Sequence, residues 1–187
     1  MAPQPAPAAP PDPWAAIPEA PISLGSLSGQ KLLVLQIGAV IAADTAAQQA
    51  ARQAAGPALD TALERANTGI DWVTVAEQRR AARRNPTVSV NPERLPTDQL
   101  LDPAVDRVPP GLVISMRALA AMTGSRYALA PAALRVTPVS GGYDATWVMV
   151  LADSRTGNVM ARLRASGSGT TMEEALQAAS ARVVAGQ

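Results

Sequence analysis

Four arginines are the clearest group of side chains that could bind a ligand. The stretch AEQRRAARR contains Arg79, Arg80, Arg83 and Arg84. On a helix this spacing lines up cations along one side, where they can hold a phosphate, an acidic partner or a lipid head group. The plainer interpretation is a solvated basic face with Glu77 nearby, because basic helices are common on protein surfaces. We predict a partner-binding role for these four arginines and keep the plainer interpretation beside it.

Carboxylates recur at regular intervals after this stretch. Asp98, Asp102 and Asp106 lie four residues apart, a spacing that would stack them on a helix. Pro103 interrupts any such helix, so no acid–base pair can be assigned. A calcium loop is an alternative, but the stretch lacks the glycine and the terminal glutamate of an EF-hand. The sequence therefore predicts no metal-binding residue.

The stretch SGSGTT, residues 166–171, precedes a helix and has some likeness to a phosphate-binding loop. It lacks a lysine and the Gly-Lys-Ser/Thr ending of a P-loop. Thr170 with Glu173, and Thr171 with Glu174, both match a capping box, and the two glutamates already occupy the positive start of the helix. We therefore predict a structural cap at this position and no cofactor site.

The residue types that are missing narrow the chemistry further. The 187-residue chain has no histidine and no cysteine. It therefore lacks the commonest general base, the commonest metal ligand and any thiol nucleophile. Without histidine, its serines and threonines do not favour a hydrolytic triad. The net charge is +1 and no stacking aromatics accompany the arginines, so nucleic acid is not expected as a partner. No catalytic residue is predicted.

Apolar periodicity and turn residues predict the elements that must position these groups. The run KLLVLQIGAVIAA indicates a buried strand at about 32–37, because it lies too far along the chain for a signal peptide and is too short to span a bilayer. Asp44-Thr45 begins a helix that Gly56-Pro57 interrupts. Further elements are expected at 58–66 (helix), 71–75 (strand), 76–84 (helix), 96–101 (a helical turn), 112–122 (helix closed by Gly124), 126–139 (extended, broken by Pro131), 145–152 and 159–165 (strands), and 171–184 (helix).

This order of elements predicts an α/β fold. We expect a mixed sheet of about five strands in the order β-α-β-α-α-β-β-β-α, with flanking helices and an antiparallel meander at the carboxyl end. Residues 145–152 are apolar on both faces, which is typical of a central strand, in one sheet with 32–37. The buried set is expected to include Leu33, Leu35, Leu63, Val73, Val148, Val150 and Leu176.

Two segments depart from this pattern. Residues 1–28 are rich in proline and alanine, and we expect a disordered tether that leaves 29–187 as a single α/β domain. Residues 85–111 contain several prolines and are predicted to form an irregular loop. A loop of that length is often a binding or variable insertion.

Several stretches resemble a family of bacterial envelope domains. The hairpin YDATWVMVLADSRTGNVMARLRA, residues 143–165, is similar to a recurring hairpin whose first strand ends in a Leu-x-Asp-x-x-Thr-Gly turn. The domains that share it are the TolB amino-terminal region, the curli secretion lipoprotein CsgG and the penicillin-binding-protein activator LpoB. The stretches LSGQKLLVLQIGAV, PALDTALERANTGIDWVTVAEQRRAA and LAAMTGSRYALAPAALRV resemble other parts of that domain in the same order.

The resemblance implies a mixed sheet flanked by helices, export to the periplasm and non-catalytic work through contacts with other envelope proteins. The chain has no lipobox cysteine, so membrane contact is expected only through an anchor outside this chain. We therefore predict a periplasmic or outer-membrane-associated interaction domain that is not an enzyme and needs no cofactor. The alternative is a small-ligand-binding or enzymatic α/β domain that uses the 85–111 loop. For the preferred function, we predict one binding patch made of the four arginines and the adjoining loop from Asn85 to Pro110.

Overall fold

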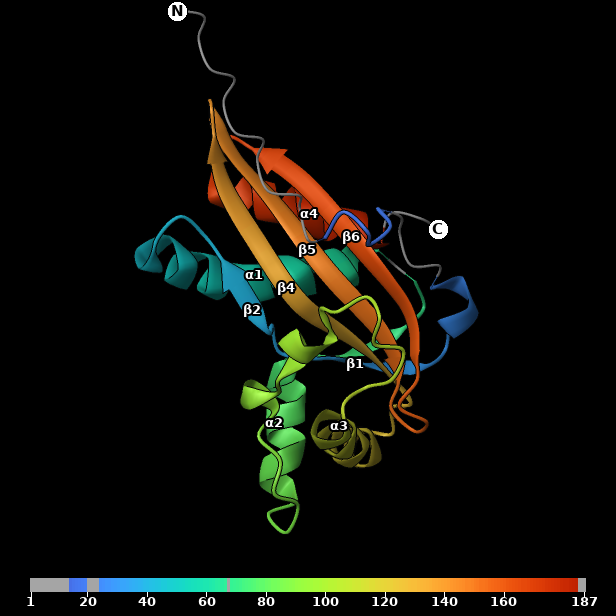
Figure 1. Ribbon diagram of the computed structural model, residues 1–187. Helices are drawn as coiled ribbons and strands as arrows, with labels where there is room; N and C mark the ends of the chain where they lie inside the picture. The colour runs from blue at the N-terminus through green and yellow to red at the C-terminus, as the bar shows by residue number, and fades with distance from the viewer. Residues whose placement is uncertain (1–13, 20–23, 67, 185–187) are drawn as a thin grey trace, which may run out of the picture.

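The computed structural model describes residues 14–19, 24–66 and 68–184, and it has the predicted α/β fold (Figure 1). Within these residues, four α-helices and six strands follow one another with short 3-10 helices between them. Their bounds are β1 Lys31–Val34, β2 Ala39–Ile41, α1 Thr45–Arg65, β3 Asp71–Val73, α2 Val75–Arg84, α3 Pro110–Thr123, β4 Tyr127–Val139, β5 Gly142–Asp153, β6 Val159–Gly169 and α4 Met172–Val184. The 3-10 helices are Gly25–Leu27, Pro92–Arg94 and Thr97–Leu100, and the last of these is the helical turn predicted at 96–101.

All six strands belong to one mixed sheet. Its order is β3-β1-β4-β5-β6, and β2 pairs with β4 beyond the end of β1. The pairs β1–β3, β1–β4 and β2–β4 are parallel, whereas β4, β5 and β6 form the predicted antiparallel meander. The prediction that 145–152 and 32–37 share a sheet is confirmed. The sixth strand, β2, arises because the chain leaves the sheet after Val34 and returns at Ala39.

The prediction that Pro131 breaks the third extended segment was wrong. Strand β4 continues through Pro131, and a shift in its pairing with β5 between Pro131 and Ala133 accommodates the proline. The carbonyl of Pro131 accepts a hydrogen bond of 3.0 Å from Gly38 N–H. Gly38 lies so close to its neighbours that a Cβ atom would stand 2.3 Å from the backbone nitrogen of Asp98. Only glycine leaves room for the 85–111 segment at this crossing.

Helix α1 also runs through a predicted interruption. Pro57 lies inside one continuous helix of 21 residues, although proline removes one backbone donor. The buried residues Ala51, Ala55, Leu59 and Leu63 are four positions apart and continue past the proline. Because both halves of the helix bury the same face, their shared packing outweighs the lost hydrogen bond.

Two apolar layers cover the two faces of the sheet. Helices α1 and α4 lie behind the long strands in Figure 1 and pack on one face. On this face the indole Nε1–H of Trp147 donates to Ser180 Oγ at 3.1 Å and ties β5 to α4. The opposite face is covered by α3 and by the segment between α2 and α3, which crosses in front of the strands (Figure 1). Helix α2 contacts the sheet through the buried side chain of Gln78.

The predicted loop 85–111 is therefore part of the core rather than a free insertion. Leu95, Leu100 and Val108 are buried in the same apolar layer as the alanines of β4. Thr97 Oγ1 donates to the Gln36 carbonyl at 2.9 Å. The face of the sheet that lacks a second long helix is thus closed by an irregular segment, which avoids the exposure of an apolar surface.

Arg162 of β6 holds the middle of this segment. Its guanidinium donates to the carbonyls of Leu100, at 3.4 Å, of Pro103, at 3.5 Å, and of Val105. Burial lowers the pKa of Arg162, and the nearby carboxylate of Asp102 opposes that shift. One arginine therefore satisfies carbonyls that a 3-10 helix and a turn leave without backbone partners.

The amino-terminal segment covers the remaining apolar surface. The indole ring of Trp14 lies 4.0 Å from the Arg135 guanidinium carbon, and both Trp14 and Ile17 are buried in the second layer. The Pro18 carbonyl accepts a hydrogen bond from Arg164 N–H of β6 at 2.8 Å. The disordered tether predicted for 1–28 therefore differs from the structure over 14–19 and 24–28, because apolar side chains there find core sites. Residues 1–13 and 20–23 lie outside the described residues.

All seven predicted core side chains are buried, namely Leu33, Leu35, Leu63, Val73, Val148, Val150 and Leu176. Val150 is 0% exposed in the middle of β5. We expect Val150→Asp to unfold the protein, because an unpaired buried charge costs several kcal/mol, on the order of the whole stability of a domain. Circular dichroism should show no cooperative thermal transition for this variant. A melting curve like that of the wild type would contradict the placement of β5.

Trp14 tests whether the amino-terminal segment contributes to folding. We expect Trp14→Ala to lower the free energy of unfolding by about 3 kcal/mol, the usual cost of truncating a buried aromatic side chain. Urea denaturation measures this loss. Ile114→Ala is the control, because Ile114 is 65% exposed and its truncation should change stability little. Equal stability of Trp14→Ala and the wild type would contradict the packing of this segment.

Candidate functional site

Helix α2 carries the four predicted arginines and begins with a capping box. Thr74 Oγ1 accepts from the Glu77 N–H at 3.4 Å, and the Glu77 carboxylate accepts from the Thr74 N–H at 2.8 Å. Glu77 is thereby placed at the positive end of the helix, where its charge is favourable. All four arginines lie on exposed positions of α2.

The structure divides the four arginines into two pairs. Arg79 forms an ion pair with Glu93 of the following segment, and Arg80 lies 3.9 Å from Glu77. Arg83 and Arg84, in the last turn, are exposed and form no ion pair with any described residue. We call these four residues the arginine face. The Arg79–Glu93 pair shows that the segment after α2 returns alongside it.

Gln78 is the only side chain of α2 that is fully buried, and sequence reasoning missed it. Its Nε2 donates to the Val34 carbonyl at 2.8 Å and to the Val73 carbonyl at 2.9 Å, at the ends of β1 and β3. Its Oε1 is buried without a hydrogen-bond partner. A glutamine between arginines gives no apolar signal, so its role as the link from α2 to the sheet appears only in the tertiary structure.

An acidic pocket of about 270 Å³ lies between α1 and the start of α2. Its lining includes Asp60, Glu64, Glu77, Arg80 and Trp72. Burial raises the pKa of Asp60, and the neighbouring carboxylates of Glu64 and Glu77 raise it further. Sequence patterns do not bring Asp60 and Glu64 together with Glu77, because α1 and α2 meet only in the tertiary structure. The pocket places acidic groups around Arg80 and so neutralises part of the arginine face.

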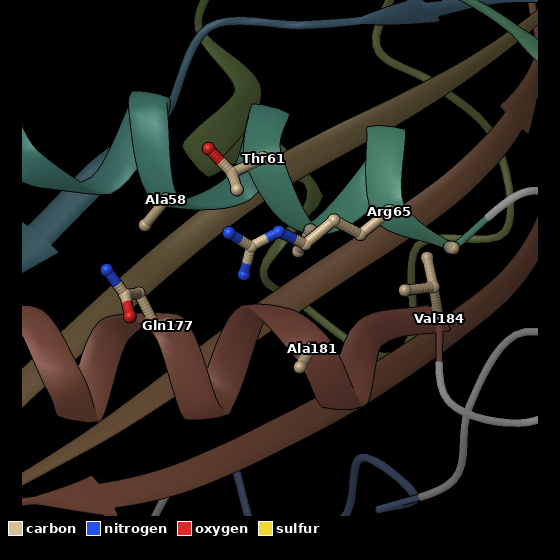
Figure 2. A pocket seen from close by; sticks show the side chains of 8 residues that line it. Ala58, Thr61, Arg65, Gln177, Ala181 and Val184 are labelled. Carbon is tan, nitrogen blue, oxygen red and sulfur yellow. The ribbon is translucent and has the colours of Figure 1, made fainter.

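A shallow groove of about 370 Å³ runs between α1 and α4 (Figure 2). Small side chains such as Ala58 and Ala181 form much of its lining, and the Arg65 side chain lies along it with its guanidinium toward Gln177 (Figure 2). The groove has one cation and two neutral polar side chains, Thr61 and Gln177, among otherwise small apolar groups. It offers shape and hydrogen bonding but no pair of groups for acid–base chemistry.

The hairpin turn after β5 is organised by Asp153. Its Oδ1 accepts from the N–H groups of Arg155, at 2.8 Å, and Thr156, at 3.0 Å, while its Oδ2 accepts from Arg126. Burial by itself raises the pKa of Asp153, but the hydrogen bonds from Thr156, Arg155 and Arg126 outweigh it, so the net pKa is below the usual value. Asp153 is thus an ionised structural group in the turn that the sequence predicted.

The other predicted features have structural roles as well. Glu174 accepts hydrogen bonds from Thr170 and from the Thr171 N–H, which confirms a structural cap before α4. Gly124 ends α3 in the left-handed conformation, as predicted. Across residues 14–19, 24–66 and 68–184, no three acidic side chains gather as a metal site would require. Within the same residues, no helix has both the length and the apolarity to cross a bilayer.

No protein-family model matches the chain, and no curated protein matches it. The solved structures with a similar fold include the LpoB C-terminal domain from Escherichia coli, with 16% identity over 76% of this chain and 84% of that chain and a TM-score of 0.43. A PelC dodecamer from Paraburkholderia phytofirmans has 15% identity over 89% and 90% of the two chains and a TM-score of 0.44. The lipoprotein GNA1162 from Neisseria meningitidis has 17% identity over 73% and 78% and a TM-score of 0.38. These identities and TM-scores assign neither a family nor a function to the chain.

Asp60 yields a test that depends on pH. Because its pKa is raised in the native state, the native protein binds more protons than the unfolded chain, and stability falls as pH rises above 3.8 toward the native value. We expect Asp60→Asn to raise the melting temperature slightly at pH 7, where the wild-type carboxylate is ionised beside Glu64 and Glu77. The gain should shrink as the pH falls and disappear well below pH 3.8, where the wild-type carboxyl is protonated in both the native and the unfolded state.

Calorimetry of both proteins across this pH range measures the difference. Asp98→Asn, which neutralises an exposed carboxylate outside the pocket, controls for the change in net charge. A lower melting temperature for Asp60→Asn at pH 7 would contradict the repulsion within the acidic pocket.

Proposed function

We propose that this chain is a non-enzymatic protein-interaction domain of the bacterial cell envelope, periplasmic or outer-membrane-associated, which binds other envelope proteins through the arginine face. The hairpin at 143–165 and its companion stretches support the envelope assignment through their resemblance to TolB amino-terminal, CsgG and LpoB-like domains. The chemistry of the described residues supports a binding role, because they contain neither histidine nor cysteine and no organised pair of carboxylates next to a nucleophile.

One observation carries the location of the binding surface. Arg83 and Arg84 are exposed at the carboxyl end of α2 without an acidic partner among the described residues. Their guanidinium groups offer forked donors that match the carboxylates of a partner. The cations also lie at the negative end of the helix dipole, which stabilises them there in the absence of a partner.

The segment that follows α2 is anchored beside the arginine face. Residues 85–91 continue directly from Arg84 and are largely exposed, and the chain is then anchored by buried Pro92 and by the Arg79–Glu93 ion pair. A surface that is already ordered loses less conformational entropy on binding than a free loop does. We therefore place the patch on the arginine face and residues 85–94, rather than on the whole of 85–110, whose later part is packed on the sheet.

The alternative, a small-ligand-binding or enzymatic domain that uses the 85–111 loop, gains no specific support. Leu95, Leu100 and Val108 of that loop are buried in the core. Three of the loop's backbone carbonyls accept hydrogen bonds from Arg162, so these groups are not open to a ligand. The acidic pocket and the α1–α4 groove lie outside this loop.

The test is recovery of partners from an envelope extract by the purified chain. We expect a variant with all four arginines of the arginine face changed to glutamine to lose the partners that the wild type recovers. Arg83→Gln/Arg84→Gln should show most of that loss. Arg79 and Arg80 already pair with acidic side chains of this chain, so Arg83 and Arg84 are the cations that are available to a partner.

Arg65→Gln/Arg182→Gln is the matched control, because it removes two exposed cations from α1 and α4 instead. Circular dichroism establishes that every variant is folded. Equal recovery by the wild type and the quadruple variant would refute the arginine face as the binding surface. Loss with the control alone would place the surface at the α1–α4 groove.

A further inference from the structure

A second basic site lies where α3 meets the hairpin turn between β5 and β6. A pocket of about 340 Å³ opens there, and three arginines contribute to its lining: Arg117 of α3, Arg126 just before β4, and Arg155 of the turn. Ala120 and Ala121 supply apolar surface between them. These residues are far apart in the sequence, and the arginine face contributes none of the lining.

Internal hydrogen bonds hold two of these arginines in place. Arg117 Nη2 donates to the Arg155 carbonyl at 2.9 Å, which ties α3 to the turn. Arg126 donates through Nε and Nη2 to Asp153 Oδ2, both at 3.1 Å. Asp153 in turn fixes the backbone of the turn through its other oxygen. The guanidinium groups of Arg117 and Arg126 are therefore held in place before any ligand arrives.

The charges around the pocket are not balanced. Asp153 is the acidic group that contacts these arginines, and it forms an ion pair with Arg126. Arg117 donates only to a neutral carbonyl, and the Arg155 guanidinium forms no ion pair with any described residue. Three arginines line this pocket and Asp153 is the acidic side chain in contact with them, so the site carries an excess of positive charge. Guanidinium groups bind carboxylates through paired hydrogen bonds.

From this geometry we infer that the pocket binds a carboxylate side chain of an acidic peptide segment, with an apolar neighbour of that side chain resting on Ala120 and Ala121. The alanine surface favours a peptide over a bare inorganic anion, because a bare anion gains nothing from apolar contact. The volume suits one or two side chains rather than a large ligand. This inference concerns residues other than the arginine face, and it stands or falls independently of the proposed function.

The experiment is a titration of the isotopically labelled full chain, followed by NMR. The probes are N-acetyl-Leu-Glu-amide, its Leu-Gln counterpart and inorganic phosphate, each added separately. We expect the Leu-Glu probe to shift the backbone amides of Ala121, Ser125, Ser154 and Arg155, and the Leu-Gln probe to leave them unchanged. Phosphate should bind these positions more weakly than the Leu-Glu probe.

Arg155→Gln is the informative variant, because this side chain has no internal ion pair whose loss would disturb the fold. We expect it to weaken binding of the Leu-Glu probe about tenfold, the effect of losing one charge-assisted hydrogen bond. Arg83→Gln/Arg84→Gln should bind the probe like the wild type. Unchanged affinity in Arg155→Gln, or phosphate binding as tight as that of the Leu-Glu probe, would overturn the assignment.

Discussion

Strand β5, which lies between β4 and β6 in the sheet, is buried on both faces, and the other elements must cover both of these faces. From Trp147 to Ala152 no residue of β5 is more than 3% exposed, so each face of the sheet needs a complete cover. Helices α1 and α4 provide one cover with regular apolar stripes. The helix that covers the other face is α3, which does not extend along the full length of the meander.

Because regular helices do not cover this face completely, irregular segments of the chain cover the rest of it. The 85–111 segment and residues 14–19 complete the second cover, and polar anchors hold them because they lack the hydrogen bonds of regular elements. Thr97 binds the Gln36 carbonyl, Arg162 binds three carbonyls of the segment, and Arg164 N–H binds Pro18. The last of these contacts also shields part of the outer edge of β6, which would otherwise be open to pairing with another chain.

The arginines fall into two groups: some hold parts of the fold together, and others lie exposed on the surface. Arg162 is partly buried and serves the core, whereas Arg79 and Arg80 have acidic neighbours on the surface. Only cations without such neighbours, such as Arg83, Arg84 and Arg155, are free to meet a carboxylate from outside. A nearly neutral chain can therefore present small basic surfaces without a strong overall field. Binding at such surfaces depends on local geometry, which suits protein partners.

Local sequence patterns determined the elements and their chemistry. The two-sided apolar run at 145–152 indicated a strand covered on both faces, which is β5, although the middle strand of the sheet is β4. Asp153 to Gly157 indicated the turn, and the threonines before α4 indicated its cap, because each signal lies within a few neighbouring residues. The position and spacing of the arginine face also followed from one helix. The order of elements was enough to predict an α/β fold with an antiparallel meander.

Tertiary structure alone decided how the irregular parts and the charged groups come together. Local rules for proline predicted breaks at Pro57 and Pro131, yet packing on both sides of each residue keeps α1 and β4 continuous. The contacts of Arg162 join residues about sixty positions apart, and the acidic pocket joins α1 to α2. The pocket of Arg117, Arg126 and Arg155 likewise forms only when α3 meets the hairpin turn. Periodicity describes which side of an element is apolar, but it contains no information about which distant element will lie against that side.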